Sequence, residues 1–276
     1  MKFEKWQALG NDYAIVEAAA LPWELTAERV RAFCEPHFGV GADGILLLSP
    51  GDADVVANLR IFNPDGSEAE LSGNGAREAA MYLRRSGWTE ADEFAIGTPS
   101  GVVRPKILDE RTCAMEIGRA STSSADFPSG GSDGRGIVSA TGREFSFQHV
   151  SIGNPQCVID VGDEVEAISL EAYGQDIEHS DLFPNRTNVS FIQIDGSNVR
   201  ARIWERGVGE TLSSGTGASG AAIAAFLRGS ASPITVNLDG GELEVAVSEN
   251  LDVLLTGWAE RVYAGELSDA LLKRLA

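Results

Sequence analysis

The stretch that decides the fold occurs twice: residues 60–80 read RIFNPDGSEAELSGNGAREAA, and residues 202–222 read RIWERGVGETLSSGTGASGAA. The two copies align without a gap, 142 positions apart. A second pair, LGNDYAIV at 9–16 and IGNPQCVI at 152–159, repeats at an offset of 143. One offset close to half of the 276-residue length predicts two similar halves, with a site built between them from paired loops.

Around the repeat, short β-rich runs alternate with glycine turns, and consecutive strands often lack a helix between them. This order predicts an α+β architecture with much antiparallel strand. Helices are predicted over 25–39, with Thr26 as N-cap, and over 76–87, with a counterpart over 218–230. Residues 121–136, rich in Ser, Gly and Asp, read as a linker or a long surface loop. The strand candidates are YAIVEA, GILLLS, VVANLRIF, FAIGT, QCVIDV, NVSFIQI, VRARIWE, ITVNL, LEVAV and LDVLLTG.

The length suits two domains of ordinary size better than one core. We place the domain boundary near residue 120. The first domain then comprises residues 1–120 and a returning C-terminal segment of about residues 263–276, and the second comprises residues 121–262.

The composition argues against several classes of protein, namely nucleic-acid-binding, membrane-spanning and metal-binding proteins. A net charge of −19 argues against a nucleic-acid partner, which requires clustered Lys and Arg. No signal peptide is visible and no run approaches the apolar length of a membrane span, so we expect a cytoplasmic protein. The cysteines and histidines have no metal-ligand spacing, so we expect reduced thiols and no metal. These residues are Cys34, Cys113, Cys157, His37, His149 and His179.

The repeat carries a specific chemistry. In each half a strand leads to a turn, and then Ser-Gly-X-Gly-Ala opens an alanine-rich helix. The glycines let a ligand approach the backbone closely, and the free N–H groups of the first helical turn attract a carboxylate or a phosphate. Two such helix starts facing one cleft would bind one anionic group.

Six motifs recur in the order of a known family: LGNDY (9–13), FGVGADG (38–44), RIFNPDGSEAELSGNGAR (60–77), GNPQ (153–156), NRTNVSF (185–191) and ERGVGETLSSGTGA (205–218). Over essentially its whole length the chain resembles the diaminopimelate epimerases. The resemblance implies two pseudo-symmetric domains of like fold with one active site in the cleft between them, and no cofactor. It also implies a small amino-acid substrate and a homodimer. In that family two cysteines work on opposite faces of the substrate's α-carbon, one removing the proton and the other donating one.

The resemblance assigns a substrate-binding set. Asparagine amides and an arginine suit the distal amino-acid end, helix-start amides suit the reacting α-carboxylate, and a glutamate suits an ammonium. The implied substrate-binding residues are Asn11, Asn63, Gly73, Asn74, Asn154, Asn188, Glu205, Arg206, Gly215 and Thr216.

The chain departs from the family at the catalytic positions. Ser72 and Ser214 stand where the family has its two cysteines, Gln156 stands where a histidine is usual, and Glu78 stands where a further cysteine is common. A cysteine thiol ionises near pH 8.5, whereas a serine hydroxyl normally needs an adjacent base. We therefore predict Ser72, Ser214 and Glu205 as the catalytic group, with Glu78 as an alternative base if burial raises its pKa.

Three explanations of the serines stay open. The two cysteines of an ordinary epimerase were replaced artificially, or a natural branch still epimerises diaminopimelate with serines and nearby carboxylates. In the third, the scaffold binds an amino acid without epimerising it or catalyses a different isomerisation. We favour the second because nearly every substrate-recognition motif is intact.

Overall fold

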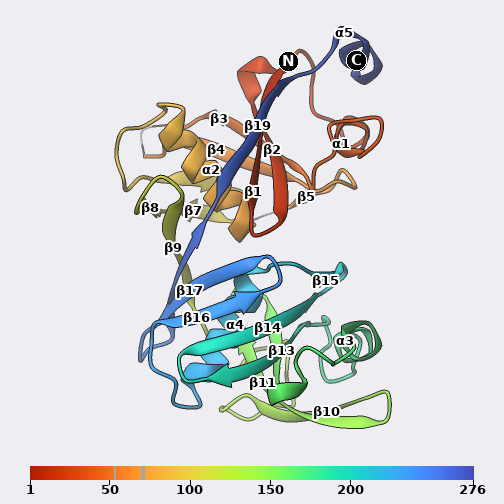
Figure 1. Cartoon of the computed structure of the whole chain (residues 1–276), viewed down its shortest axis with the longest axis vertical. Helices are drawn as coiled ribbons and strands as arrows, with labels where there is room; N and C mark the ends of the chain where they lie inside the picture. The colour runs from red at the N-terminus through yellow and green to blue at the C-terminus, as the bar shows by residue number, and fades with distance from the viewer. Residues whose placement is uncertain (53, 70–71) are drawn as a thin grey trace. The chain divides into compact units, whose positions relative to one another are not determined.

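The computed structural model describes residues 1–52, 54–69 and 72–276, which divide into two compact units (Figure 1). Unit 1 comprises residues 1–115 and 257–276, and unit 2 comprises residues 116–256. The chain passes between the units within strands β9 (Thr112–Arg119) and β18 (Asp252–Trp258). Whether independent domains divide near residues 120 and 262 stays a prediction.

In its described residues, unit 1 is a mixed sheet with the α-helices α1, α2 and α5. Two pairs of strands, β2–β3 and β4–β6, run parallel, and their connections contain α1 (Ala27–Cys34) and α2 (Gly73–Arg85) respectively. Helix α5 (Asp269–Leu275) ends the chain. The strands lie in the order β19 (Glu260–Glu266), β1 (Lys2–Ala8), β2 (Asn11–Glu17), β3 (Ile45–Pro50), β4 (Ala57–Phe62), β6 (Ile96–Thr98) and β7 (Gly101–Val103). Strand β5 (Glu68–Ala69) pairs with β4, and β8 (Pro105–Ile107) pairs with the start of β9.

Unit 2 repeats this plan. Strands β12 and β13 run parallel across α3 (Leu170–Glu178), and β14 and β16 run parallel across α4 (Gly215–Phe226). The strands lie in the order β10 (Arg135–Ala140), β11 (Arg143–Ser151), β12 (Pro155–Asp160), β13 (Asn188–Asp195), β14 (Asn198–Glu205), β16 (Ile234–Leu238), β17 (Gly241–Val247) and β18. Strand β15 (Gly209–Thr211) pairs with β14 as β5 pairs with β4.

Side-chain contacts repeat along with the topology. In unit 1 an ion pair joins Arg60 to Glu68 across β4 and β5 at 2.7 Å, and in unit 2 the matching pair joins Arg202 to Glu210 at 2.6 Å. These are the Arg and Glu positions that the two sequence copies share. The predicted α+β fold with two halves of like structure is confirmed.

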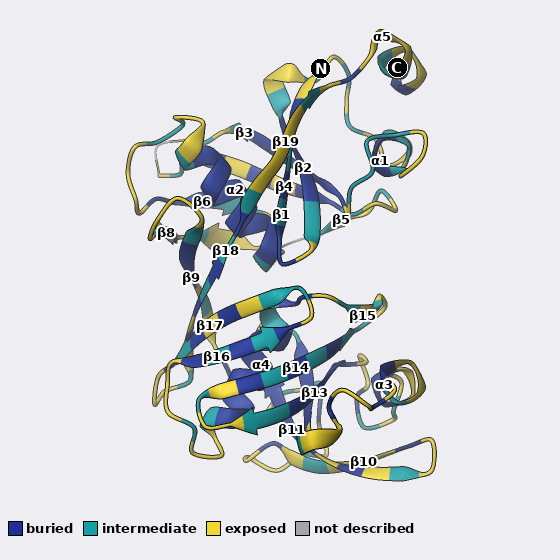
Figure 2. Cartoon of the chain, in the orientation of Figure 1, coloured by how far each residue is buried: buried dark blue, intermediate teal, exposed yellow. Residues whose placement is uncertain are grey.

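The two helices that follow the repeated motif are almost wholly buried (Figure 2). Helix α4 contacts β11, β12, β13, β14, β16 and β17, so it is covered on most of its surface. Its Gly- and Ala-rich sequence fits this position, because a Cβ on Gly217 would lie 2.6 Å from the Ile203 side chain. Close packing of small residues thus holds the N-terminus of the helix in place.

The predicted ends of α1 are partly right. The hydroxyl of Thr26 accepts a hydrogen bond from the Arg29 N–H at 3.4 Å, so the predicted N-cap is confirmed. The helix ends at Cys34 rather than near Gly39. Glu35 is extended because Pro36 follows it, and the residue before a proline is disfavoured in the helical region.

The segment 121–136 belongs to unit 2, which begins before it at residue 116, so it is not a linker. It runs as a loop as far as Gly134 and then enters β10 at Arg135. Phe127 anchors the loop in the unit 2 core, where its ring centroid lies 5.1 Å from that of Phe147 and 5.7 Å from that of Phe183. Composition alone does not reveal this buried aromatic residue.

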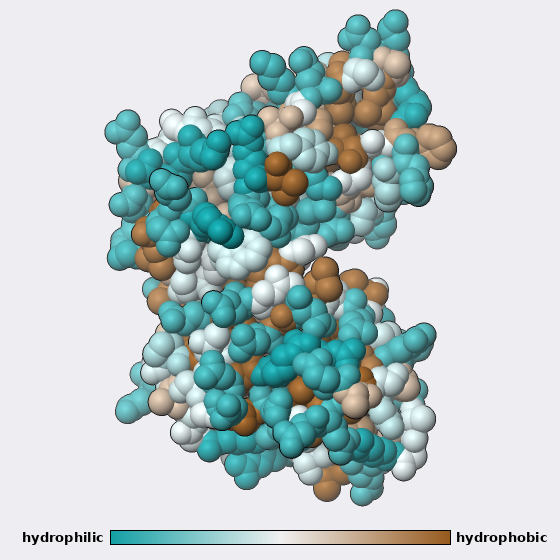
Figure 3. Space-filling view, in the orientation of Figure 1, coloured by the Kyte–Doolittle hydropathy of each residue, from teal (hydrophilic) through white to brown (hydrophobic). Residues whose placement is uncertain are grey.

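Hydrophobic side chains also reach the surface of unit 1 near α1 and α5 (Figure 3). Leu271 and Leu272 of α5 pack, partly buried, on the cluster that includes Val30 and Phe33 of α1. This packing fixes the C-terminal helix on the unit. None of the helices in the described part of the chain has the length and apolar character that crossing a membrane requires.

Candidate active site

In unit 1 the first repeated serine caps a buried helix. Ser72 is the N-cap of α2, and its Oγ accepts the Gly75 N–H at 3.1 Å. The same oxygen accepts the phenolic O–H of Tyr13, on β2, at 3.4 Å. The hydroxyl is therefore fixed from two elements at once.

The asparagines beside Ser72 form a chain of hydrogen bonds. Asn74, in the first turn of α2, donates from Nδ2 to Asn11 Oδ1 at 3.2 Å, and Asn11 donates from Nδ2 to Asp43 at 3.0 Å. The buried Arg77 guanidinium donates to Asn74 Oδ1. The structure thus brings Asn11, Asn74 and, through α2, Gly73 together with Ser72.

Asn63 stands apart from this group. Its amide donates to Ser67 Oγ at 3.0 Å, and its backbone N–H donates to the Ser67 carbonyl at 2.9 Å. These bonds close the turn between β4 and β5, which is the structural use that asparagine often has in a turn. Among the described residues no hydrogen bond connects Asn63 to Ser72.

In unit 2 the second repeated serine contacts a carboxylate. Ser214 is the N-cap of α4 and accepts the Gly217 N–H at 3.2 Å, while its own O–H donates to Glu205 Oε2 at 3.2 Å. Glu205 ends β14. Burial raises the pKa of Glu205, and the hydrogen bond from Ser214 offsets part of that rise.

Unit 2 repeats the asparagine contact of unit 1. Asn154 donates to Thr216 Oγ1 at 3.2 Å, and these two residues match Asn11 and Asn74 in the paired motifs. Thr216 follows Gly215 in the first turn of α4. The buried Gln156 donates to Asn154 Oδ1 at 2.7 Å and thereby orients its amide.

The remaining predicted residues of unit 2 meet beside the end of β14. Asn188, at the start of β13, donates to the Pro155 carbonyl at 3.0 Å and accepts the Arg206 N–H at 2.9 Å. The Arg206 guanidinium donates to the Asn185 carbonyl at 2.9 Å. Glu205, Arg206 and Asn188 therefore form one cluster.

Sequence reasoning missed Tyr13. The signal is present, because the paired motifs place Tyr13 opposite Gln156, a position at which the chain departs from the family that it resembles. In the sequence Tyr13 is one residue of the LGNDY motif, whereas the structure brings its phenol to Ser72.

The alternative base, Glu78, lies in the interior of unit 1. It is fully buried in α2, and burial raises its pKa well above the ordinary value. The Arg77 charge and the Tyr13 backbone N–H offset only part of this rise. No hydrogen bond joins Glu78 to Ser72 within the described chain. Glu205, by contrast, contacts Ser214 directly.

The surroundings of the three cysteines disfavour the reactive thiolate form. All are free and buried, and burial raises the pKa of Cys34 and of Cys113 to about 12. Cys157 lies in the hydrophobic core of unit 2. Reactive cysteines instead have a lowered pKa, so none of these three replaces the missing thiols.

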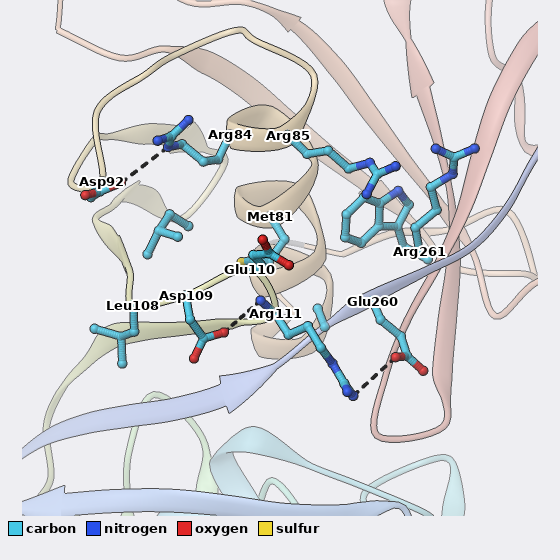
Figure 4. Close-up of a pocket in the computed structure, with 13 residues that line it drawn as sticks. Met81, Arg84, Arg85, Asp92, Leu108, Asp109, Glu110, Arg111, Glu260 and Arg261 are labelled. Atoms are coloured by element: carbon cyan, nitrogen blue, oxygen red, sulfur yellow. Dashed lines mark hydrogen bonds and ion pairs between the residues drawn. The ribbon is translucent and has the colours of Figure 1, made fainter.

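Unit 1 also contains a pocket of about 750 Å³ (Figure 4). Ion pairs of 3.3 Å between Arg84 and Asp92 and of 3.2 Å between Arg111 and Glu260 neutralise charges at its wall. None of the predicted catalytic or substrate-binding residues lines it. We therefore do not assign it to the reaction.

Solved structures share the fold at low sequence identity. A hydroxyproline epimerase from Agrobacterium vitis superposes with a TM-score of 0.66 and 18% identity, covering 96% of this chain and 91% of that one. A PhzF-family phenazine biosynthesis protein from Bacillus anthracis gives a TM-score of 0.67 and 16% identity, covering 97% and 99% of the two chains.

Sequence comparison is more specific. The family profile described as diaminopimelate epimerase matches residues 3–123 and 148–262. Diaminopimelate epimerase 2 of Nostoc sp. is 39% identical over 274 residues, covering 97% of this chain and 96% of that protein. The diaminopimelate epimerase of Pelotomaculum thermopropionicum is 39% identical over 279 residues, with 96% and 98% covered. The chain belongs to the diaminopimelate epimerase family.

Proposed function

We propose that this chain is a cofactor-independent isomerase that interconverts LL- and meso-diaminopimelate by removing and returning the proton at one α-carbon. The observation that carries the proposal is the hydrogen bond between Ser214 and Glu205 at the N-terminus of α4. It supplies the base that a serine hydroxyl needs. The proposed catalytic residues are Ser72, Ser214 and Glu205.

We propose further that the two half-sites serve one substrate molecule. The N–H groups at the starts of α2 and α4, around Gly73–Asn74 and Gly215–Thr216, would bind the α-carboxylate, where the positive ends of the helix dipoles also favour negative charge. Glu205 would attract the α-ammonium. The end of the substrate far from the reacting α-carbon would be bound by the remaining polar side chains, which are Asn11, Asn63, Asn154, Asn188 and Arg206.

Intact recognition residues support this substrate. The Asn11–Asn74 and Asn154–Thr216 contacts hold the proposed binding amides in matching positions in the two units. Asn188 is likewise fixed by Pro155 and Arg206. A pre-oriented set of amides lowers the entropic cost of binding a polar ligand.

The test is incubation with LL- or meso-diaminopimelate in D2O, following deuterium at the α-carbon and the ratio of stereoisomers. We expect deuterium uptake together with epimerisation, and loss of epimerisation in Ser72→Ala and in Ser214→Ala. Confirmed binding with no uptake at high enzyme concentration would refute the proposal. Replacing both serines by cysteine should raise turnover sharply, because a thiol ionises far more readily than a hydroxyl.

A second candidate is a protein that binds an amino acid without epimerising it. The serines favour it, since neither is acidic enough to act without help. It predicts calorimetric binding of one amino acid from a panel, with no exchange of the α-hydrogen of that ligand. A different isomerisation on the same scaffold would instead show exchange with a substrate other than diaminopimelate.

The oligomeric state of the protein and its location in the cell stay predictions. We propose a homodimer, which the edge strand β19 supports because it leaves Val262 53% and Tyr263 40% exposed. Sedimentation velocity at several concentrations tests it. A cytoplasmic location is the further expectation, and fractionation of the source cells tests it.

A further inference from the structure

The two repeated serines occupy equivalent positions but have opposite hydrogen-bond polarity. Both are N-caps, and both accept the N–H of the glycine three residues on, at 3.1 Å for Ser72 and 3.2 Å for Ser214. Beyond this shared bond they differ. Ser72 accepts a second hydrogen bond, from the Tyr13 phenol, whereas Ser214 donates its proton to Glu205.

This difference decides what each hydroxyl can do next. A serine hydroxyl has one proton to donate and two acceptor sites. At Ser72 both acceptor sites are used, and within the described residues no acceptor is paired with its proton. At Ser214 the proton is directed to a carboxylate and one acceptor site remains open. Ser72 is arranged to give a proton, and Ser214 to take one.

The rest of each half-site is consistent with this polarity. Gln156 occupies in unit 2 the motif position that Tyr13 occupies in unit 1, yet its amide donates to Asn154 rather than to Ser214. In the described structure of unit 2 no phenol contacts Ser214. The asymmetry thus comes from two departures within the repeat, a tyrosine in one copy and a carboxylate contact in the other.

We infer that Tyr13 is a positioning residue that makes Ser72 the proton donor of the resting enzyme, while the Ser214–Glu205 pair removes the proton. This inference rests on the proposed function and assigns its two proton-transfer sides. Tyr13 acts through Ser72 and need not contact the substrate.

These four side chains account for every proton that the reaction moves. Ser214 Oγ takes the α-proton while its own proton moves to Glu205, and the electron pair of the broken C–H bond stays on the α-carbon. On the other face Ser72 gives its proton to that carbon and receives the phenolic proton of Tyr13. The enzyme is left with a protonated Glu205 and a Tyr13 phenolate, which is the form that processes the opposite epimer and restores the first.

The test is Tyr13→Phe, which removes one hydroxyl and keeps the ring. Tyr82→Phe is a matched control, because Tyr82 is a buried tyrosine of the same unit whose hydroxyl donates to Glu17 at 2.8 Å. Each variant is incubated in D2O with LL- and with meso-diaminopimelate, and α-deuterium exchange is compared with inversion. Thermal unfolding of each variant is recorded alongside.

In Tyr13→Phe we expect inversion to fall about tenfold or more, in the range that general acid catalysis contributes. For the epimer whose proton the Ser214–Glu205 pair removes, exchange with retention should persist, so the ratio of exchange to inversion rises. Ser72→Ala should give the same pattern without altering Tyr13, and it covers the case in which Tyr13→Phe does not fold. Glu205→Gln should remove exchange and inversion of that epimer together.

An unchanged ratio of exchange to inversion in Tyr13→Phe and in Ser72→Ala, with both folded, overturns the inference. So does an equal change in the Tyr82→Phe control. A wild-type protein that shows no exchange at all refutes the proposed function instead, so the two failures are distinguishable.

Discussion

The Glu205 carboxylate links the proposed chemistry to pH. A base works in its ionised form, and burial raises the pKa of Glu205 above its ordinary value of 4.5. Activity should therefore fall as the pH drops through that raised value. We expect Glu205→Gln to lose this acidic limb of the pH profile of kcat/KM, and to lower kcat/KM about 100-fold or more.

Glu210→Gln is the control for that profile. Glu210 lies on the neighbouring strand, and its side chain, which is 42% exposed, pairs with Arg202; an ion pair with an exposed partner contributes little. Its replacement should leave both the pH profile and kcat/KM close to wild type. An acidic limb that survives in Glu205→Gln would show that another group is the base.

Glu78 affects stability rather than the reaction. Burial raises its pKa well above 4.5, so between the unfolded and folded values the native state holds a proton that the unfolded chain has lost. The free energy of unfolding then falls as the pH rises through this window. Glu78→Gln cannot titrate, so its Tm relative to wild type should increase as the pH rises above the ordinary glutamate value of 4.5.

Glu68→Gln tests the opposite sign. The Arg60 guanidinium holds the pKa of Glu68 below its ordinary value, so this carboxylate contributes stability above that value and loses it as the pH falls. The effect should be small because the pair is largely exposed.

For Glu78, the contradicting result is a Tm difference between Glu78→Gln and wild type that does not change with pH. It would mean that the pKa of Glu78 is not raised by burial in the folded protein.

Single residues differ in how far the sequence predicts their place. The repeat and the motif order led to Ser72, Ser214 and Glu205, and the structure joins the last two by a hydrogen bond. The Tyr13 contact with Ser72 could not be read in the same way, since it joins residues 59 positions apart on different elements. Asn63 matches a family motif, but its side-chain bond lies within its own turn.

Helix α3 depends on a glycine that helix propensity disfavours. A Cβ on Gly174 would lie 2.6 Å from the Trp204 ring, immediately before Glu205 on β14. Gly174→Ala should therefore destabilise the protein by about 1–3 kcal/mol through overpacking, despite the roughly 1 kcal/mol that alanine adds to an exposed helix. Chemical denaturation measures the change.

Gln175→Ala provides the matched comparison within the same helix. Gln175 is exposed, so alanine there adds helix propensity without a new contact, and stability should stay constant or rise slightly. Equal unfolding midpoints for the two alanine variants would mean that the helix moves freely away from Trp204.

Helices and strands were predictable where the local sequence pattern favours the same structure that packing in the folded unit requires. The β-branched runs at β13 and β16 read as strands and are strands. Strands β1 and β19 escaped prediction because charged residues interrupt their apolar positions, and their partnership joins the two ends of the chain. Helix α3 escaped because Gly174 interrupts its pattern for a packing reason that no local rule contains.

At the level of the whole chain, the repeat is what made the fold predictable. One offset shared by two motif pairs indicates two copies of one topology, and the structure shows the same strand order and the same parallel connections in both units. The return of residues 257–276 to unit 1 has no counterpart in the repeat. It arises from long-range pairing of β19 with β1, which sequence periodicity does not encode.

The proposal that residues of both units act on one substrate molecule makes a prediction about combined substitutions. Ser72 belongs to unit 1 and Glu205 to unit 2. If both act on one α-carbon, Ser72→Ala and Glu205→Gln should each lower kcat/KM for epimerisation by about 100-fold, and the double variant should lose far less than the product of the two. Residues that act in one catalytic step are strongly non-additive, because either loss already disables the step.

The comparison pair is Ser72→Ala with Glu210→Gln, whose effects should multiply because Glu210 lies outside the proposed reaction. Kinetics of all five variants in one buffer give both cycles. Multiplicative losses in the Ser72–Glu205 cycle as well would mean that the units work on separate molecules. In that case the pairing of the two halves reflects common descent of their folds rather than a shared site.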